Sequence, residues 1–454
     1  MAAAVPIAIA EGDALVAAAV RRLPPRDEQT AAFGIAVSGG ADSLALLHLV
    51  AGWATRSRVP KPRLHILTVD HGLRPGSAGE AQAVAVRARA LGLEHATLRW
   101  IGDKPKTAIQ AQARDARYQL IGDFAREHGL DAVFIAHTAD DQAETVLMRL
   151  AHGSGLDGLA GMQALSRRDD LVLLRPLLSV AKVRLLATLQ AAGTTWIEDP
   201  SNQQRVFERI RVRAAAPLLG DLGLTAASIG RTARRLERAS AALIAATEAL
   251  LADQTFFQGF ELGYCRFPLA RWQSLPDEIR VRTLGRLLVM IGGQSGPVSM
   301  LQVEDLVARL CRPGPRGATL GRCALSVSAG AITIVREEGR SALPTLTVLP
   351  GIASVWDNRF AIGLLPTATG TAEVRALGAD GLADVTTGGL RRPGLPAAAL
   401  RTLPSFWRQG RLVAVPSLAA IMPYGGPAEA AIKALCGDAR ATFLGLRGVA
   451  NASQ

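Results

Sequence analysis

Residues 33–50 read FGIAVSGGADSLALLHLV, an apolar run followed by two glycines and then a second apolar run. The first run predicts a buried strand, and the second has the spacing of a helix that begins near Asp42. Two adjacent glycines let the backbone approach a ligand closely, and the free N–H groups at a helix start attract anions. Hydroxyl groups at Ser38 and Ser43 add further donors. The segment therefore predicts a phosphate-binding loop, and a turn with Asp42 and Ser43 capping the helix is the structural alternative.

Short apolar runs alternate with helical patterns up to about residue 200, which predicts a parallel α/β sheet. The predicted strands are Phe33–Val37, Leu64–Val69, Ala96–Trp100, Ala132–Ala136 and Leu171–Leu174. The predicted helices are Asp42–Trp53, Ser77–Leu91, Ala108–His128 and Asp141–His152. Ligands of such sheets bind beyond the carboxyl ends of the strands. Because SGGADS, DHGLR (70–74) and HTADDQAET (137–145) each follow a strand, we expect the functional site there.

Acidic residues stand out in two of these segments. Asp42 lies where phosphates are expected, and a carboxylate there is explained if it binds Mg²⁺, which favours one or two carboxylates together with phosphates. Asp141 and Glu144 are three residues apart and so share one face of a helix. The alternative for this pair is an acidic first turn that complements the helix dipole.

The composition points to a nucleic-acid partner. The 454 residues carry a formal net charge of +12, and clustered Lys and Arg bind polyanions by releasing counterions, although a generally basic surface is the alternative. Only 4% of residues are aromatic, so contacts should rely on arginine and phosphate more than on base stacking. The four cysteines begin at Cys265 and include no C-x-x-C pair, which argues against a disulfide scaffold, a zinc site or an iron–sulfur cluster.

The N-terminus is apolar but has no basic n-region and is interrupted by Glu11 and Asp13. It therefore fits neither a signal peptide nor a membrane span, and we expect a cytoplasmic protein without a membrane partner.

Several motifs together resemble those of one family. SGGADS is similar to the PP-loop of the ATP pyrophosphatases, which hold pyrophosphate while the α-phosphate of ATP is attacked; the G-x-x-x-x-G-K-[ST] loop is missing. The further matching segments are VDHGLR (69–74), AQARDARY (111–118), AHTADDQAET (136–145), RPLL (175–178) and WIEDPSN (196–202). In this order they resemble the tRNA(Ile)-lysidine synthases over about residues 30–220, and more loosely beyond. The chain departs from the family at His137-Thr138, where many members have paired histidines, and at residues 208–211, which read ERIR where Arg-Asn-Arg is usual.

The resemblance implies an α/β fold class: a Rossmann-like, parallel-sheet PP-loop ATPase domain, a helical domain and a smaller mixed α/β C-terminal domain. We expect the catalytic domain at 1–220, a connecting helix at 221–255, a helical tRNA-binding domain at 256–340 and a β-containing domain at 341–454. Apolar residues at Ile229, Leu236, Leu243 and Leu250 repeat every seven residues along the connecting helix. The segment Ala324–Arg336 predicts a β-hairpin that turns at Ala329-Gly330.

The resemblance also implies a reaction. In the family, ATP adenylates the C2 oxygen of the wobble cytidine in the tRNA(Ile) with a CAU anticodon, and free L-lysine then displaces AMP. The expected ATP-binding residues are Ser38, Gly39, Gly40, Ala41, Asp42, Ser43 and His137, with Asp42 as the Mg²⁺ ligand. The expected catalytic residues are Asp42, Arg117, Asp141 and Glu144, and the expected lysine-binding residues are Arg114, Asp141 and Glu144. For the two helix arginines the alternative is a solvated face paired with Asp115 or Glu127, and His137 has an equally open structural alternative.

Two groups of arginines are the expected tRNA contacts. They are Arg205, Arg209, Arg211 and Arg213, and then Arg231, Arg234, Arg235 and Arg238. A solvated charged face is the alternative for both groups. Two other functions stay open: a tRNA thiolase, which needs cysteines that residues 1–264 lack, and a regulatory module that binds ATP without turnover. The oligomeric state is open as well, with a homodimer as one option.

Overall fold

The computed structural model describes residues 4–24, 31–57, 61–73, 76–102, 104, 109–197, 208–312, 317–339, 342–387, 395–419 and 438–445. The chain forms two compact units, Met1–Ala241 and Ala242–Gln454.

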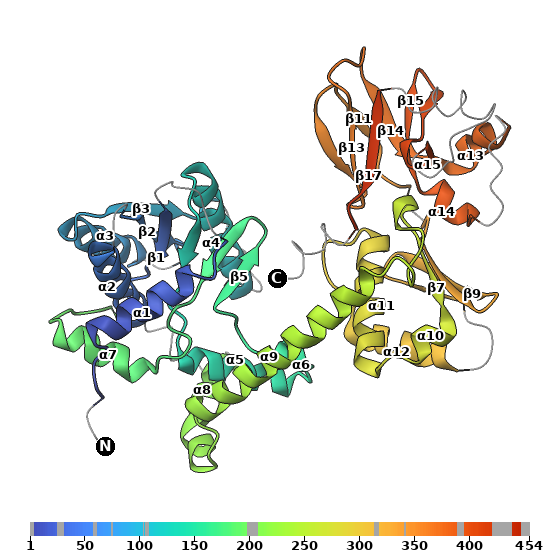
Figure 1. The fold of residues 1–454 in the computed structure, drawn as a ribbon. Helices are drawn as coiled ribbons and strands as arrows, with labels where there is room; N and C mark the ends of the chain where they lie inside the picture. The colour runs from blue at the N-terminus through green and yellow to red at the C-terminus, as the bar shows by residue number, and fades with distance from the viewer. Residues whose placement is uncertain are drawn as a thin grey trace. The chain divides into compact units, whose positions relative to one another are not determined.

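The first unit is built on a six-stranded sheet with the strand order β3-β2-β1-β4-β6-β5 (Figure 1). Its strands are β1 (Ala32–Ala36), β2 (Arg63–Asp70), β3 (Glu94–Arg99), β4 (Ala132–Phe134), β5 (Leu165–Arg168) and β6 (Leu171–Leu174). All neighbouring strands are parallel except β5 and β6, which are antiparallel. The predicted parallel α/β sheet is confirmed, and the edge strand β5 is an element that the sequence did not predict.

Helices cover both faces of this sheet. All five residues of β1 are buried, as expected for a central parallel strand. Because successive side chains point to opposite faces, Ile35 lies in the core beneath α2 while Ala36 lies in the core beneath α4. The first core holds residues of α1 (Ile9–Val20), α2 (Ala41–Arg56), α3 (Ser77–Ala90) and α7 (Lys182–Ala191), and the second holds residues of α4 (Ile109–Glu127). The predicted helices are confirmed within a few residues, except that Ala108 lies outside the described residues.

The remaining helices of the first unit pack around α5. They are α5 (Ala139–Ala151), α6 (Leu156–Leu159), α8 (Glu208–Asp221) and the first part of α9 (Ala226–Leu251). Ala143 and Val146 of α5 pack against Ile229 and Ala233 of α9. Ser240 of α9 donates a hydrogen bond to Asp157 of α6, at 2.5 Å. Helix α9 lies within the segment 221–255, where a connecting helix was expected, and its first half lies against the helix that carries Asp141 and Glu144.

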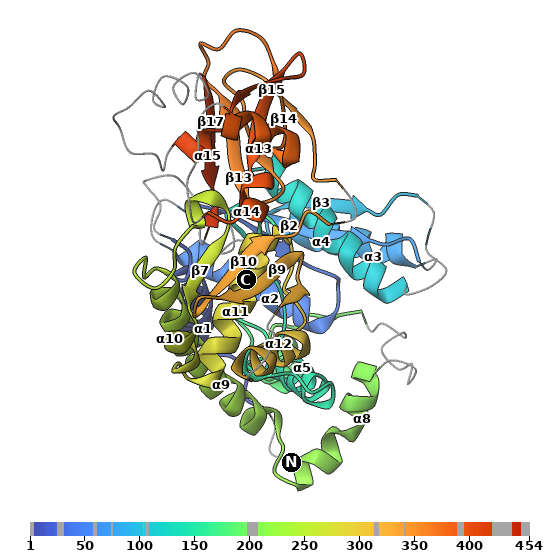
Figure 2. The ribbon, with the colours of Figure 1, turned by 90° about the vertical axis from the view of Figure 1, so that its right-hand side faces the viewer.

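The second unit contains three antiparallel sheets (Figures 1 and 2). Strands β7 (Cys265–Pro268), β8 (Ala318–Leu320), β9 (Cys323–Ser328) and β10 (Ala331–Arg336) form the first sheet, which shares a core with α10 (Leu269–Gln273), α11 (Asp277–Gly292) and α12 (Met300–Cys311). Strands β9 and β10 are the predicted hairpin, and Ala329 at its turn has a φ of 47°. The other sheets consist of β11 (Leu346–Val348), β14 (Ala372–Ala376), β15 (Pro404–Arg408) and β16 (Arg411–Ala414), and of β12 (Ala353–Trp356), β13 (Phe360–Leu364) and β17 (Ala439–Phe443). Short helices η2 (Phe260–Leu262), α13 (Gly378–Thr387), α14 (Ala397–Arg401) and α15 (Pro416–Ala419) complete the unit.

Within the described ranges, no helix combines the length and the apolar character that crossing a bilayer requires.

Candidate active site

The strand order reverses beside β1, because β2 and β3 lie on one side of it and β4 lies on the other. Ligands of open α/β sheets bind at such a switch point, beyond the carboxyl ends of the strands. The loop at residues 37–40 follows β1, and residues 135–138 follow β4, which pairs with β1 through Ile35 and Phe134. The topology thus brings SGGADS and HTADDQAET side by side.

The glycine loop has the conformation of an anion cradle. Gly39 has a φ of 85°, in the left-handed region that favours glycine, and a Cβ there would lie 3.1 Å from Ile197 Cδ1. The Ser43 hydroxyl donates to the Gly40 carbonyl at 2.9 Å and accepts from the Ser38 N–H at 3.1 Å, which holds the loop closed on itself. Within the part of the chain that the structure describes, the backbone N–H groups of residues 39–43 have no acceptor. They are therefore available to an anion at the start of α2.

Asp42 does not cap α2, as the structural alternative required. Gly40 is the N-cap residue, and the Asp42 carboxylate instead accepts a hydrogen bond from Lys182 Nζ, at 2.9 Å. Its other oxygen, Oδ1, is buried and has no partner among the described residues. Burial raises the pKa of Asp42, and the Lys182 ammonium only partly offsets this. A buried carboxylate oxygen without a partner, beside the free N–H groups of residues 39–43, is suited to bind a cation.

Asp141 is fixed by a capping box at the start of α5. Its Oδ2 accepts from the Thr138 N–H and from the Thr138 hydroxyl, both at 2.9 Å, and the same hydroxyl accepts from the Asp141 N–H at 3.3 Å. Burial works against the carboxylate, but the bonds from Thr138 and the charge of Arg209 outweigh it and lower the pKa of Asp141. Asp141 is thus a rigid carboxylate at neutral pH. Thr138 serves as the N-cap of α5.

Glu144 is held by two arginines of α8. Arg209 Nε donates to Glu144 Oε2 at 2.7 Å, and Arg213 Nε donates to Oε1 at 2.7 Å. The side chain of Glu144 is 7% exposed, whereas those of the two arginines are 35% and 46% exposed. The structure therefore brings together an expected lysine ligand and two expected tRNA contacts.

His137 follows β4 and is fixed by Arg175, which follows β6. Arg175 Nε donates to His137 Nδ1 at 3.0 Å, and Arg175 itself is bound by Ser166 and by the Gln163 carbonyl. Burial, together with the nearby guanidinium, lowers the pKa of His137 to about 3. His137 is therefore neutral, and because Nδ1 accepts, its proton lies on Nε2.

Arg114 and Arg117 lie on α4. Arg114 is exposed and stacks on Tyr118, with its Cζ 5.3 Å from the ring centre. Arg117 is partly buried, and burial lowers its pKa. Among the described residues Arg117 has no hydrogen bond or ion pair, and Asp115, one of the two partners in the alternative of a solvated face, binds Arg168 at 2.7 Å. A guanidinium without a counterion suits an incoming anion.

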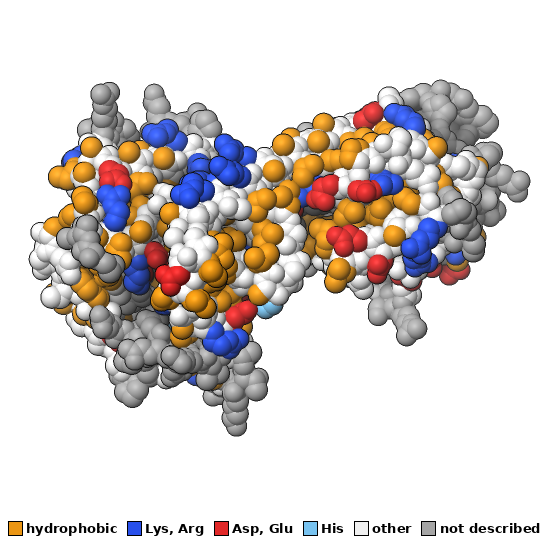
Figure 3. All heavy atoms as spheres, turned by 90° about the horizontal axis from the view of Figure 1, so that it is seen from below, with side chains coloured by type: hydrophobic (Ala, Val, Ile, Leu, Met, Phe, Trp, Pro, Cys, Tyr) orange, Lys and Arg blue, Asp and Glu red, His pale blue; other side chains and the backbone are white. Residues whose placement is uncertain are grey.

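The other expected tRNA contacts lie on α8 and α9, except Arg205, which is outside the described residues. Arg231, Arg234, Arg235 and Arg238 of α9 are all exposed, on the side away from Ile229 and Ala233. On the face seen in Figure 3, Lys and Arg side chains lie singly or in small groups among apolar and acidic ones. The group of arginines on α9 is therefore a better guide to an RNA-binding surface than the total charge of the chain.

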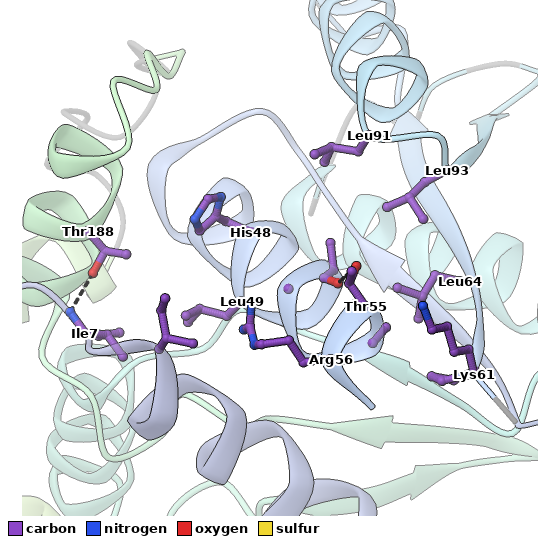
Figure 4. A pocket seen from close by; sticks show the side chains of 15 residues that line it. Ile7, His48, Leu49, Thr55, Arg56, Lys61, Leu64, Leu91, Leu93 and Thr188 are labelled. Carbon is purple, nitrogen blue, oxygen red and sulfur yellow. Dashed lines mark hydrogen bonds between the residues drawn. The ribbon is translucent and has the colours of Figure 1, made fainter. Parts of the chain in front are cut away.

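A cavity of about 450 Å³ lies at the other end of the sheet (Figure 4). It is lined by the C-terminal half of α2, with His48, Leu49 and Arg56, and by Leu64 at the start of β2. These residues lie at the amino ends of the strands, and no expected site residue is among the lining residues. This cavity is therefore separate from the site at the switch point.

Comparisons with known proteins identify the family of the chain. A PP-loop domain family matches residues 15–218. The tRNA(Ile)-lysidine synthase of Ruegeria pomeroyi is 40% identical over 393 residues, which cover 87% of this chain and 89% of that protein. The chain belongs to the tRNA(Ile)-lysidine synthase family. The synthases of Bradyrhizobium diazoefficiens and of a second Bradyrhizobium are 43% and 47% identical, covering 67% and 61% of this chain and 87% and 79% of those proteins.

Two side chains of this lysidine synthase site were missed at the sequence level. Lys182 reaches Asp42 from the start of α7, and Arg175 reaches His137 from the end of β6. Arg175 is the first residue of the RPLL segment, so its place after a strand was a usable signal. Nothing near Lys182 in the sequence distinguishes it from a surface lysine.

Proposed function

We propose that this protein attaches L-lysine to C2 of the wobble cytidine of the tRNA(Ile) with a CAU anticodon, through an adenylated cytidine, and releases AMP and pyrophosphate. The observation that supports this most is the placement of SGGADS and the Asp141/Glu144 pair at the ends of two adjacent strands. One site can then activate a base with ATP and hold the amine that attacks it.

The first half of the reaction needs an oriented triphosphate. The free N–H groups of residues 39–43 and the hydroxyls of Ser38 and Ser43 would bind the phosphates that leave as pyrophosphate. Arg117, with no counterion among the described residues, would neutralise charge that develops as the α-phosphate is attacked. The neutral His137 would donate from Nε2 to the nucleotide or to the cytidine.

Mg²⁺ fits the residues present. The unpartnered Asp42 Oδ1 is the oxygen that would hold it, beside the loop that binds phosphates. Within the described residues no cluster of three metal-binding side chains occurs, as expected for an ion that takes its other ligands from ATP and water. When bound, Mg²⁺ would supply positive charge to the phosphate oxygens.

The second half needs a carboxylate site for an amino acid with two amines. Asp141 is fixed by the capping box and charged, so it can orient an ammonium and accept a proton from the attacking amine. Glu144 lies one turn along the same face of α5 and would bind the other ammonium of lysine. Arg114 is exposed and close enough to His137 to help lower its pKa, and it is the candidate for the lysine carboxylate.

RNA binding is assigned to the exposed arginines of α9 and to α8. The α9 group is anchored on α5, so a tRNA held there lies within the same unit as the site. Contacts of arginine to phosphate carry little sequence information, and specificity would come mainly from RNA shape.

Mass analysis of tRNA nucleosides after incubation with ATP and lysine tests the proposal directly. Lysidine in place of the wobble cytidine is the expected product, with AMP released only when tRNA is present. Stable ATP in the presence of tRNA and lysine would refute it in favour of a regulatory ATP-binding module. A thiolated product would instead indicate the thiolase, which the absence of cysteine before Cys265 argues against.

A further inference from the structure

We propose that Arg209 and Arg213 are positioning residues that keep Glu144 closed to lysine until RNA phosphates draw them away. The inference rests on the proposed function, because it needs lysine and RNA as substrates of this site. It makes the lysine site dependent on bound tRNA.

The two arginines occupy the carboxylate that lysine would use. Glu144 Oε1 accepts from Arg213 Nε at 2.7 Å, and Oε2 accepts from Arg209 Nε at 2.7 Å and from a terminal nitrogen of Arg213 at 3.1 Å. Three of the roughly four lone-pair directions of a carboxylate are therefore taken. With its side chain only 7% exposed, Glu144 offers little further access to an ammonium.

The local charge leads to the same conclusion. Three carboxylates meet three cations here, namely Asp42 with Lys182, and Asp141 and Glu144 with Arg209 and Arg213. Arg213 interacts with all three carboxylates, since Glu144 first, and then Asp141 and Asp42, raise its pKa. Lysine, which carries two ammonium groups and one carboxylate, gains little attraction when it enters a cluster that is already neutralised. Lysine is favoured only after positive charge leaves.

The two arginines that bind Glu144 are accessible to a competing anion. Their side chains are 35% and 46% exposed, so an RNA phosphate can reach both guanidinium groups while they still hold Glu144. Helix α8 buries none of its residues, and its further polar contacts with α5 include those of Arg209 with the Asp141 carbonyl at 3.3 Å and the Thr145 hydroxyl at 3.4 Å, and that of Glu208 with His152 at 3.2 Å. The helix is thus held on α5 largely by exchangeable charges.

An RNA backbone is the partner that suits this exchange. A phosphate accepts two parallel hydrogen bonds from a guanidinium, as Glu144 does from Arg213, so one ligand can replace the other without loss of bonding. We call Arg209 and Arg213 the clamp. Further positive charge lies nearby, on Arg211, which stands between them in the sequence, and on the exposed arginines of α9. RNA bound to them would raise the local phosphate concentration at the clamp.

Lysine binding with and without RNA tests the clamp. Equilibrium dialysis would use labelled L-lysine, saturating α,β-methylene ATP and a tRNA(Ile) transcript with the CAU anticodon. In the unaltered protein we expect the transcript to tighten lysine binding about tenfold. Arg213→Gln should bind lysine without RNA about as tightly as the unaltered protein does with RNA.

Arg126→Gln is the matched control, because Arg126 is an exposed arginine of the same unit that pairs with Asp123 and does not touch Glu144. It should retain the RNA dependence. If Arg213→Gln fails to fold by circular dichroism, Arg213→Lys keeps the charge but loses the paired donors, and it should show a smaller RNA effect than the unaltered protein.

If the two arginines only hold α8 on α5, lysine binding will depend neither on Arg213 nor on RNA. If Arg213→Gln binds lysine no better without RNA, or if RNA leaves lysine affinity of the unaltered protein unchanged, the clamp proposal is wrong. Nucleoside mass analysis separates this from failure of the proposed function: lysidine formed without RNA-dependent lysine binding overturns only the clamp, whereas no lysidine overturns both.

Discussion

Replacing Thr138 with valine removes one hydroxyl from the start of α5 and leaves the side-chain volume nearly unchanged. Thr138 is 1% exposed, so valine is accommodated, but the hydroxyl takes part in two of the three bonds of the capping box. Loss of an N-cap costs about 1 kcal/mol, and loss of a bond to a charged carboxylate costs at least about 1.5 kcal/mol. We therefore expect the first unit to lose about 2.5 kcal/mol of unfolding free energy.

Urea unfolding measures this loss in the transition that ATP stabilises, since a ligand stabilises the unit that binds it. Thr138→Ser keeps the hydroxyl and is the control. The bonds from Thr138 help to lower the pKa of Asp141, so their contribution is complete above the ordinary aspartate pKa and is lost as pH falls through the lowered value. Equal stability of the valine and serine variants at neutral pH, or a difference that grows in acid, would refute the reasoning.

Four further outcomes are expected. Asp42→Ala and Asp141→Ala should each abolish lysine incorporation and keep tRNA binding in a gel shift; loss of the shifted band would contradict this division of roles. Gly39→Ala forces an alanine to a φ of 85° against Ile197, and should weaken ATP binding at least tenfold by calorimetry. Lys182→Met removes a group that lowers the pKa of Asp42, so the acid limb of the pH profile of AMP release should move to higher pH; an unmoved limb would exclude this coupling. Charge reversal of the α9 arginines should lower tRNA affinity and flatten its salt dependence, and unchanged affinity would show that they are solvated. The reversed residues are Arg231, Arg234, Arg235 and Arg238.

The phosphate loop and the sheet around it were predictable because their signals are local. A fully buried strand, two glycines and an apolar helix follow one another within residues 33–50, and each has its own backbone requirement. Strand β6 was predicted, but its partner β5 was missed because it has only four residues and because the turn between them uses Asp169, with a φ of 52°, instead of glycine.

The partners of the acidic side chains could not be predicted in the same way. Lys182 is 140 residues from Asp42, and Arg213 is 69 residues from Glu144. Such pairs depend on how α7 and α8 pack, and helical periodicity does not encode which surface charge meets which. The sequence therefore predicted Glu144 and the α8 arginines as site residues but assigned them to different substrates.

Ile197 has a consequence for how the protein is made. Its N–H donates to the Gly39 carbonyl at 3.1 Å, and its side chain lies beside the same glycine, so the nucleotide loop is completed by a residue near the end of the catalytic sequence. At a synthesis rate of about 5–20 residues per second, the ribosome delivers Ile197 roughly 10 to 30 seconds after Gly39. During that interval a nascent chain cannot have a finished loop, and a fragment that ends before Ile197 should not acquire one.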